Sequence, residues 1–173
     1  MLTIEAQASA FREGAEAVAG GAGWLSLLSA EELRLIWGGH AIDDAHLDVW
    51  RSKTALVGDR SERHEAVAHL FWEWLRASSE ERRAAVLQFA TGASRLPCDT
   101  QLAAWTFYIE VLPISASLTM TIQPTDSNGL NAPAMLARAS TCSKTIQLPP
   151  YEDVEALARG LEYSLMDGGF GVA

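Results

Sequence analysis

The segment WTFYIEVL, residues 105–112, decides the fold class of this chain. It is rich in aromatic and β-branched residues, which favour β-strands. A second segment, SLTMTIQ (117–123), alternates apolar and polar residues as a half-buried strand does. Upstream of Pro97, by contrast, apolar residues recur at helical spacing. Helices first and a small sheet later predict an α+β fold.

Helical segments are expected on both sides of this sheet. The first is rich in Ala and Glu and ends at a Gly-Gly pair, and the others carry an apolar face or an acidic start. The last follows a Pro-Pro stop and is amphipathic through Val154, Leu157, Leu161 and Leu165. The expected helices cover residues 2–19, 29–37, 42–50, 61–77, 78–91 and 151–166, with a short strand at 145–148.

Capping signals indicate where some of these helices begin and end. Ser29 with Glu32, and Ser78 with Glu81, have the spacing of a capping box. Gly92 is expected to end the helix that the second box begins. The Gly38-Gly39 pair ends the helix after Ser29, and it serves either as a plain stop or as a hinge.

Size and charge exclude several classes of function. The 173 residues are 49% hydrophobic, enough for one domain with a core, or for one domain plus part of another. The net charge is −9 and no basic run occurs, so nucleic acid is not expected as a partner. No apolar run reaches the roughly 20 residues of a membrane span. Because Glu5, Arg12 and Glu13 interrupt any secretory signal, we expect a cytoplasmic or nuclear protein that does not enter a membrane.

The two cysteines, Cys98 and Cys142, are expected to be free thiols. They form no CxxC motif and no Cys/His cluster, so neither a metal nor another cofactor is expected. Residue types alone favour a small buried or inert thiol at Cys142, with a nucleophile as the alternative. Lys144 and the neighbouring hydroxyls would raise its thiolate fraction only modestly.

The reactions open to Cys142 depend on whether a general base can lie next to its thiol. No histidine follows His69, so a base for amide cleavage would have to come from far upstream. This disfavours a cysteine hydrolase. Exchange of one thioester for another needs less activation, because a thiol replaces a thiol.

Seven motifs occur in the order and spacing of one family. They are AFREG (10–14), LLSAEELRLIWGG (27–39), WRSKT (50–54), LFWEWL (70–75), VLQFATGASRLP (86–97), LARASTCSKTIQLPPY (136–151) and GGFGVA (168–173). From about residue 11 to residue 173, the chain resembles the C-terminal part of the catalytic domain of HECT-type ubiquitin-protein ligases.

The resemblance implies a division of the chain into two lobes. Residues 1–38 would be the helical end of the family's amino-terminal lobe, whose larger part lies outside this chain. Residues 39–42 would form a hinge, with Gly38 and Gly39 at its centre, and residues 43–173 a carboxy-terminal lobe with a small sheet flanked by helices. Leu28 falls where the family has an apolar contact to the ubiquitin-conjugating enzyme.

The resemblance also implies a two-step transfer of ubiquitin. Cys142 would take ubiquitin from a conjugating enzyme as a thioester and pass it to a lysine of a protein substrate. Thr141 would lie beside it in the active-site turn, and Phe170 corresponds to a terminal phenylalanine linked to transfer. Phe170, Leu28 and Trp24 are accordingly expected to be more exposed than their apolar character suggests.

Three positions depart from the family pattern. Ser140 and Ser143 stand where the family usually has histidine and phenylalanine, and Ala137 replaces a usual proline. The region 101–135 is also longer than is common. These departures support a second hypothesis, a non-catalytic module that keeps the fold of the carboxy-terminal lobe and binds ubiquitin or another partner.

Overall fold

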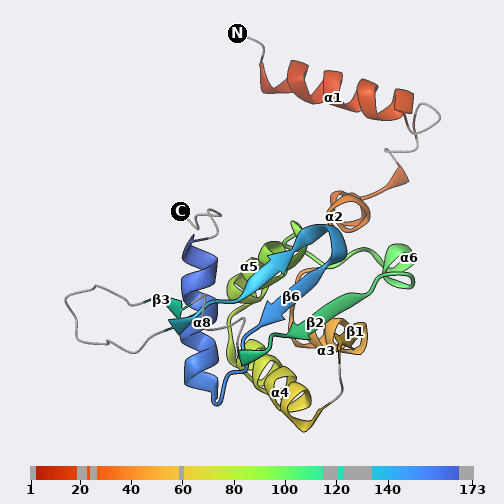
Figure 1. Cartoon of the computed structure of the whole chain (residues 1–173). Coiled ribbons are helices and arrows are strands. Elements are labelled where there is room, and N and C mark those ends of the chain that lie inside the picture. Colours follow the sequence, from red (N-terminus) through yellow and green to blue (C-terminus); the bar gives the residue numbers. More distant parts are fainter. Residues whose placement is uncertain are drawn as a thin grey trace. The chain divides into compact units, whose positions relative to one another are not determined.

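A computed structural model describes residues 3–18, 23, 27–58, 61–114, 121–122 and 134–167 of the chain. The chain divides into two compact units, Met1–Gly39 and His40–Ala173, which are described separately (Figure 1). The division falls next to the Gly38-Gly39 pair that the sequence marks as a stop or a hinge.

The described part of the first unit contains two helices, α1 (Ile4–Val18) and α2 (Ala30–Gly38), where helices were expected. The capping box at the start of α2 is confirmed: the Ser29 hydroxyl accepts from the Glu32 amide, and the Glu32 carboxylate accepts from the Ser29 amide at 2.7 Å. Neither helix buries a residue fully. The large apolar side chains that they leave exposed are Ile4, Phe11, Val18, Leu35, Ile36 and Trp37.

The second unit is built on a four-stranded sheet with the order β1-β2-β6-β5. Strands β1 (Thr54–Val57), β2 (Phe107–Val111) and β6 (Thr145–Leu148) are parallel, and β5 (Arg138–Ser140) runs antiparallel to β6 (Figure 1). The predicted strands at 105–112 and 145–148 are therefore the two interior strands. Residues 121–122 (β3, Thr121–Ile122) pair with β4 (Ala134–Met135), and the rest of the predicted strand at 117–123 lies outside the described residues.

Five helices accompany this sheet in the described part of the second unit. They are α3 (Asp44–Ser52), α4 (Glu62–Ala77), α5 (Glu80–Thr91), the short α6 (Asp99–Leu102) and α8 (Val154–Asp167). Helices α4 and α5 pack against strands, and α8 packs against α4 (Figure 1). The α+β class is confirmed. In the described residues no helix is long and apolar enough to span a membrane.

The predicted cap at Ser78 is wrong by one residue. Ser79 is the N-cap of α5, and its hydroxyl accepts from the Arg82 amide. Ser78 instead ends α4, where its amide bonds to the Leu75 carbonyl and its hydroxyl donates to the Trp74 carbonyl at 2.8 Å. Helices α4 and α5 meet at these two adjacent serines. Because Ser78 caps the end of α4, Ser79 is the residue that caps the start of α5. The predicted stop at Gly92 is confirmed by its left-handed φ of 81°.

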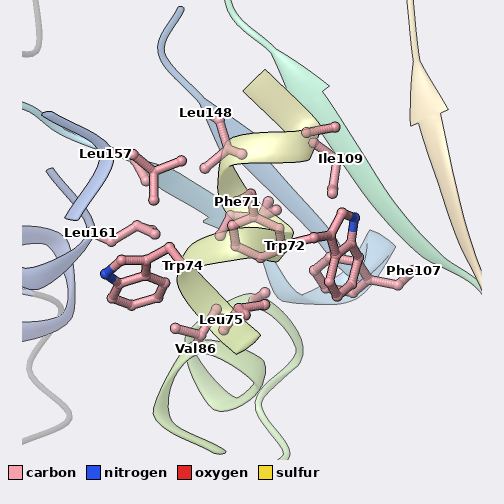
Figure 2. Packing of buried hydrophobic residues seen from close by; sticks show 14 of the residues in the cluster. Phe71, Trp72, Trp74, Leu75, Val86, Phe107, Ile109, Leu148, Leu157 and Leu161 are labelled. Atoms are coloured by element: carbon pink, nitrogen blue, oxygen red, sulfur yellow. The ribbon is translucent and has the colours of Figure 1, made fainter. Parts of the chain in front are cut away.

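An aromatic cluster with residues from α3, α4 and β2 forms the centre of the core. Trp50 makes edge-to-face contacts with Phe71, Trp72 and Phe107, at ring-centroid distances of 6.5, 5.6 and 5.2 Å. Figure 2 shows Trp74 on the other side of α4, toward Leu157 and Leu161 of α8. Alternate residues of β2, namely Phe107, Ile109 and Val111, are buried against this cluster. The core thereby fixes the position of β2, and also that of β6, which pairs with β2.

Candidate active site at the Cys142 turn

Cys142 lies in the four-residue turn that joins β5 to β6. Ser140 and Thr145 are the last paired residues of the two strands, and Thr141–Ser143 form one turn of 3-10 helix between them. The Cys142 side chain is exposed. Residue types favoured a small buried or inert thiol, and the expectation of burial is wrong, because the hairpin places this small apolar residue at its turn and not in a strand.

The turn stands on the buried interior strand β6. Ile146 and Leu148 of β6 are fully buried, and the Tyr108 amide of β2 donates to the Lys144 carbonyl at 3.0 Å. Helix α5 packs against both β5 and the turn. An exposed thiol is thus held on a rigid support, which favours a reaction that needs a defined geometry.

Hydrogen bonds between neighbouring residues close the turn. The Lys144 amide donates to the Thr141 carbonyl at 3.2 Å, and the Ser143 hydroxyl donates to the Ser140 carbonyl at 3.2 Å. The Ser143 hydroxyl also lies 2.9 Å from the Thr145 hydroxyl, which is buried. No pattern in the sequence singles out Ser143 and Thr145 as partners, since their pairing depends on the register of the hairpin.

None of the four histidines is hydrogen-bonded to Cys142. His40 bonds to Asp99, His46 to Asp43, His64 to Ser61 and the Val111 carbonyl, and His69 lies 3.4 Å from Glu73. Nor does the thiol hydrogen-bond to any other residue that the structure describes. Without an adjacent base, Cys142 suits thioester exchange better than the cleavage of an amide.

The other predicted site residues lie in different parts of the chain. Thr141 directly precedes Cys142 in the turn, whereas Leu28, Gly38 and Gly39 belong to the first unit. Leu28 is half-buried, and Gly39 adopts a φ of 72°, a left-handed value that glycine accepts without strain. Phe170 and Trp24 lie outside the described residues.

The second cysteine, Cys98, is half-buried at the start of α6. A hydrogen bond with the Thr100 hydroxyl lowers the pKa of this thiol. Both cysteines are free, as expected. Experiments on Cys142 therefore need Cys98 as a control, because it is a second thiol with some reactivity of its own.

One further pocket lies away from the turn. It has a volume of about 560 Å³ and is lined by residues at the carboxyl ends of β1 and β2 and at the start of α4. Because β1, β2 and β6 are parallel and the Cys142 turn precedes β6, this pocket is at the opposite end of the sheet. No cluster of three or more metal-ligating side chains occurs among the residues described.

Lys144 is the one described non-glycine residue with a positive φ, at 53°. A left-handed backbone costs an ordinary residue about 1 kcal/mol, and asparagine tolerates it better. We therefore expect Lys144→Asn to raise the free energy of unfolding by about 0.5–1 kcal/mol, measured by urea titration. Lys53→Asn, at a φ of −95°, is the control and should give no such gain. A loss of stability in Lys144→Asn would contradict the prediction.

Comparisons with known proteins point to one family. The sequence model of the HECT-domain (ubiquitin-transferase) family matches residues 2–173. The chain is 27% identical over 162 residues to the mouse (Mus musculus) E3 ubiquitin-protein ligase NEDD4, which covers 94% of this chain and 16% of that protein. It is 28% identical over 169 residues to the probable E3 ubiquitin-protein ligase hulA of Aspergillus terreus, covering 97% of this chain and 19% of that protein. For the Saccharomyces cerevisiae E3 ubiquitin-protein ligase TOM1 the identity is 27% over 151 residues, 86% of this chain and 4% of that protein.

Proposed function

Because this chain belongs to the HECT-domain family of ubiquitin transferases, we propose that it accepts ubiquitin as a thioester on Cys142 and passes it to a substrate lysine. The Cys142 thiolate attacks the carbonyl carbon of the thioester on a ubiquitin-conjugating enzyme. A new C–S bond forms, the old C–S bond breaks, and the thiol of the conjugating enzyme leaves. The amine of the substrate lysine then attacks the same carbon, forms an amide, loses a proton and releases the Cys142 thiol.

The observation that carries this proposal is the exposed Cys142 on a rigid hairpin, with no base hydrogen-bonded to it among the described residues. An exposed thiol is accessible to a large protein donor, and a thioester donor does not require strong activation of the nucleophile. Free cysteines also fit a reducing compartment, so we place the activity in the cytoplasm or the nucleus.

The first unit would supply docking and movement. In this proposal Leu28 contacts the conjugating enzyme, rotation about Gly38 and Gly39 brings Cys142 to donor and acceptor in turn, and Phe170 assists the transfer to substrate. The exposed Phe11 and Trp37, whose rings meet at 6.1 Å, fit a surface that the rest of an amino-terminal lobe would cover. This chain spans less than a fifth of the length of the relatives described above.

The proposal is tested with a charged conjugating enzyme and a non-reducing gel. The chain is assayed as it stands and extended by a complete HECT amino-terminal lobe, because positioning supplies much of the rate of a bimolecular transfer. We expect an adduct of ubiquitin that a reducing agent removes. Cys142→Ala should abolish this adduct, while Cys98→Ala should retain it. If the extended chain forms no adduct, the transferase proposal fails.

A non-catalytic ubiquitin-binding module is the second candidate. It is favoured by Ser140 and Ser143, which replace the family's usual histidine and phenylalanine. This function predicts NMR shift perturbations on addition of ubiquitin that Cys142→Ala leaves unchanged, together with no thioester in any assay. A reducible adduct on Cys142 would exclude it.

A further inference from the structure

The Ser143 hydroxyl bridges the two strands that carry the Cys142 turn. It donates to the Ser140 carbonyl, which ends β5, at 3.2 Å, and it lies 2.9 Å from the Thr145 hydroxyl, which begins β6. The Thr145 side chain is 8% exposed, so its hydroxyl needs a partner inside the protein. Among the described residues that partner is Ser143, through its hydroxyl and, at 3.3 Å, its carbonyl.

The direction of the protons follows from these acceptors. A carbonyl only accepts, so the Ser143 hydroxyl donates to the Ser140 carbonyl, and the single Thr145 proton is shared between the Ser143 carbonyl at 3.3 Å and the Ser143 hydroxyl oxygen at 2.9 Å. Such a chain of hydroxyls polarises along its length and is stronger than its separate bonds. It connects the buried strand β6 to the end of β5 directly across the residue that follows Cys142.

The bridge offsets a weakness in the same turn. Lys144 holds a left-handed backbone that lysine disfavours, and within the turn itself one backbone bond of 3.2 Å joins the Lys144 amide to the Thr141 carbonyl, besides the bond of 3.0 Å from the Tyr108 amide of β2 to the Lys144 carbonyl. Without the hydroxyl bridge, this strained turn would sample other conformations. The direction of the Cys142 thiol would then vary while the thiol stayed exposed.

We propose that Ser143 is a positioning residue, whose hydroxyl bridge to Thr145 and Ser140 holds the Cys142 thiol in the one orientation that accepts a ubiquitin thioester. This inference rests on the proposed transferase function and goes beyond it. It assigns a role to a residue that replaces the family's usual phenylalanine. Ser143 touches no reacting atom, and it acts only through the shape of the turn.

The test has a structural arm and a functional arm, both in a Cys98→Ala background so that Cys142 is the single thiol. The structural arm measures hydrogen exchange of the Lys144 amide by NMR. We expect Ser143→Ala and Thr145→Val each to speed this exchange about fivefold to tenfold, the size of effect that follows from one lost hydrogen bond. The double variant should be little faster than either single one, because both remove the same bridge.

The functional arm measures thioester formation on the chain extended by the amino-terminal lobe. Ser143→Ala should lower kcat about fivefold to tenfold with KM for the charged conjugating enzyme unchanged, and Ser143→Thr, which keeps the hydroxyl, should restore kcat. Ser52→Ala removes a similar hydroxyl-to-carbonyl bond of 2.7 Å at the end of α3, and it should change neither arm.

Each outcome decides between the two proposals. If hydrogen exchange of the Lys144 amide is unchanged in Ser143→Ala, the positioning role is overturned. Faster hydrogen exchange with an unchanged kcat overturns it as well, since the bridge would then stabilise the turn without orienting the thiol. If the parent chain forms no thioester at all, the transferase proposal fails. Faster exchange in Ser143→Ala and Thr145→Val but not in Ser52→Ala would in that case still support the assignment of the bridge.

Discussion

Arg83→Met is expected to lower the free energy of unfolding of the second unit by about 3–5 kcal/mol. The Arg83 side chain is 5% exposed, and its guanidinium serves four acceptors. It donates to the carbonyls of Leu75, Arg76 and Ile42 at 2.9, 2.9 and 3.2 Å, and to the Asp44 carboxylate at 2.8 Å.

The size of the effect follows from the carbonyl groups that lose the guanidinium as a hydrogen-bond donor. The Leu75 and Arg76 carbonyls belong to the last turn of α4, where few backbone donors remain, although the Leu75 carbonyl also accepts from the Ser78 amide at 3.1 Å. Methionine fills a similar volume but donates no hydrogen bond. The Arg76 and Ile42 carbonyls therefore each lose the guanidinium donor at about 1–3 kcal/mol, and the Leu75 carbonyl loses one of two donors, less whatever water restores. The ion pair adds little, because the Asp44 side chain is 78% exposed.

Urea unfolding followed by tryptophan fluorescence measures this loss. Arg82→Met is the matched control on the same helix. The Arg82 side chain is half exposed and pairs with Glu162 at 3.4 Å, so its replacement should cost less than about 1 kcal/mol. Arg83→Lys should fall close to Arg83→Met, because one ammonium cannot reach acceptors on both sides of the guanidinium. A cost below about 1 kcal/mol for Arg83→Met would contradict the role of Arg83 as the donor at the end of α4.

The sequence predicts the interior of this fold better than its edges. Strand β2 was predictable because its segment is rich in aromatic and β-branched residues, of which Phe107, Ile109 and Val111 prove to be buried. The edge strands β1 and β5 have four and three residues, too few to establish a period, and β5 exposes Arg138 and Ser140. Arg83 escapes prediction for a related reason: an arginine within a helix resembles a surface residue until the end of α4 is placed next to it.

The candidate site was likewise predicted from the sequence only in part. Ordered motifs around Cys142 predicted its turn, whereas residue types alone favoured a small buried or inert thiol, because cysteine is among the most buried residues on average. The exposure of Cys142 depends on the pairing of Ser140 with Thr145, and this register is not visible in a three-residue strand. Ala137 is a further case. Its amide, absent from the family's usual proline, donates to the buried Ser164 hydroxyl at 2.8 Å, a partner far along the chain.

Gly160→Ala is expected to lower the free energy of unfolding by about 2–4 kcal/mol, although alanine is the better helix former. Gly160 lies within α8, and a Cβ atom there would collide with the Tyr151 hydroxyl and the Met135 carbonyl. These two groups are hydrogen-bonded to each other at 2.8 Å. The Tyr151 residue is 4% exposed, and this burial raises the pKa of its hydroxyl.

The methyl group must therefore separate a buried donor from its acceptor or push α8 away from β4. Overpacking costs about 1–3 kcal/mol and a broken buried hydrogen bond a similar amount, against a gain of about 1 kcal/mol in helix propensity. Gly14→Ala, within α1, has no atom within 4 Å of the added carbon and should not destabilise its helix. Removing the Tyr151 hydroxyl with Tyr151→Phe should relieve part of the collision, so the double variant should cost less than the sum of the two single ones. Additive costs in urea unfolding would show that Gly160→Ala acts elsewhere, since the tyrosine hydroxyl is the nearest atom to the added carbon.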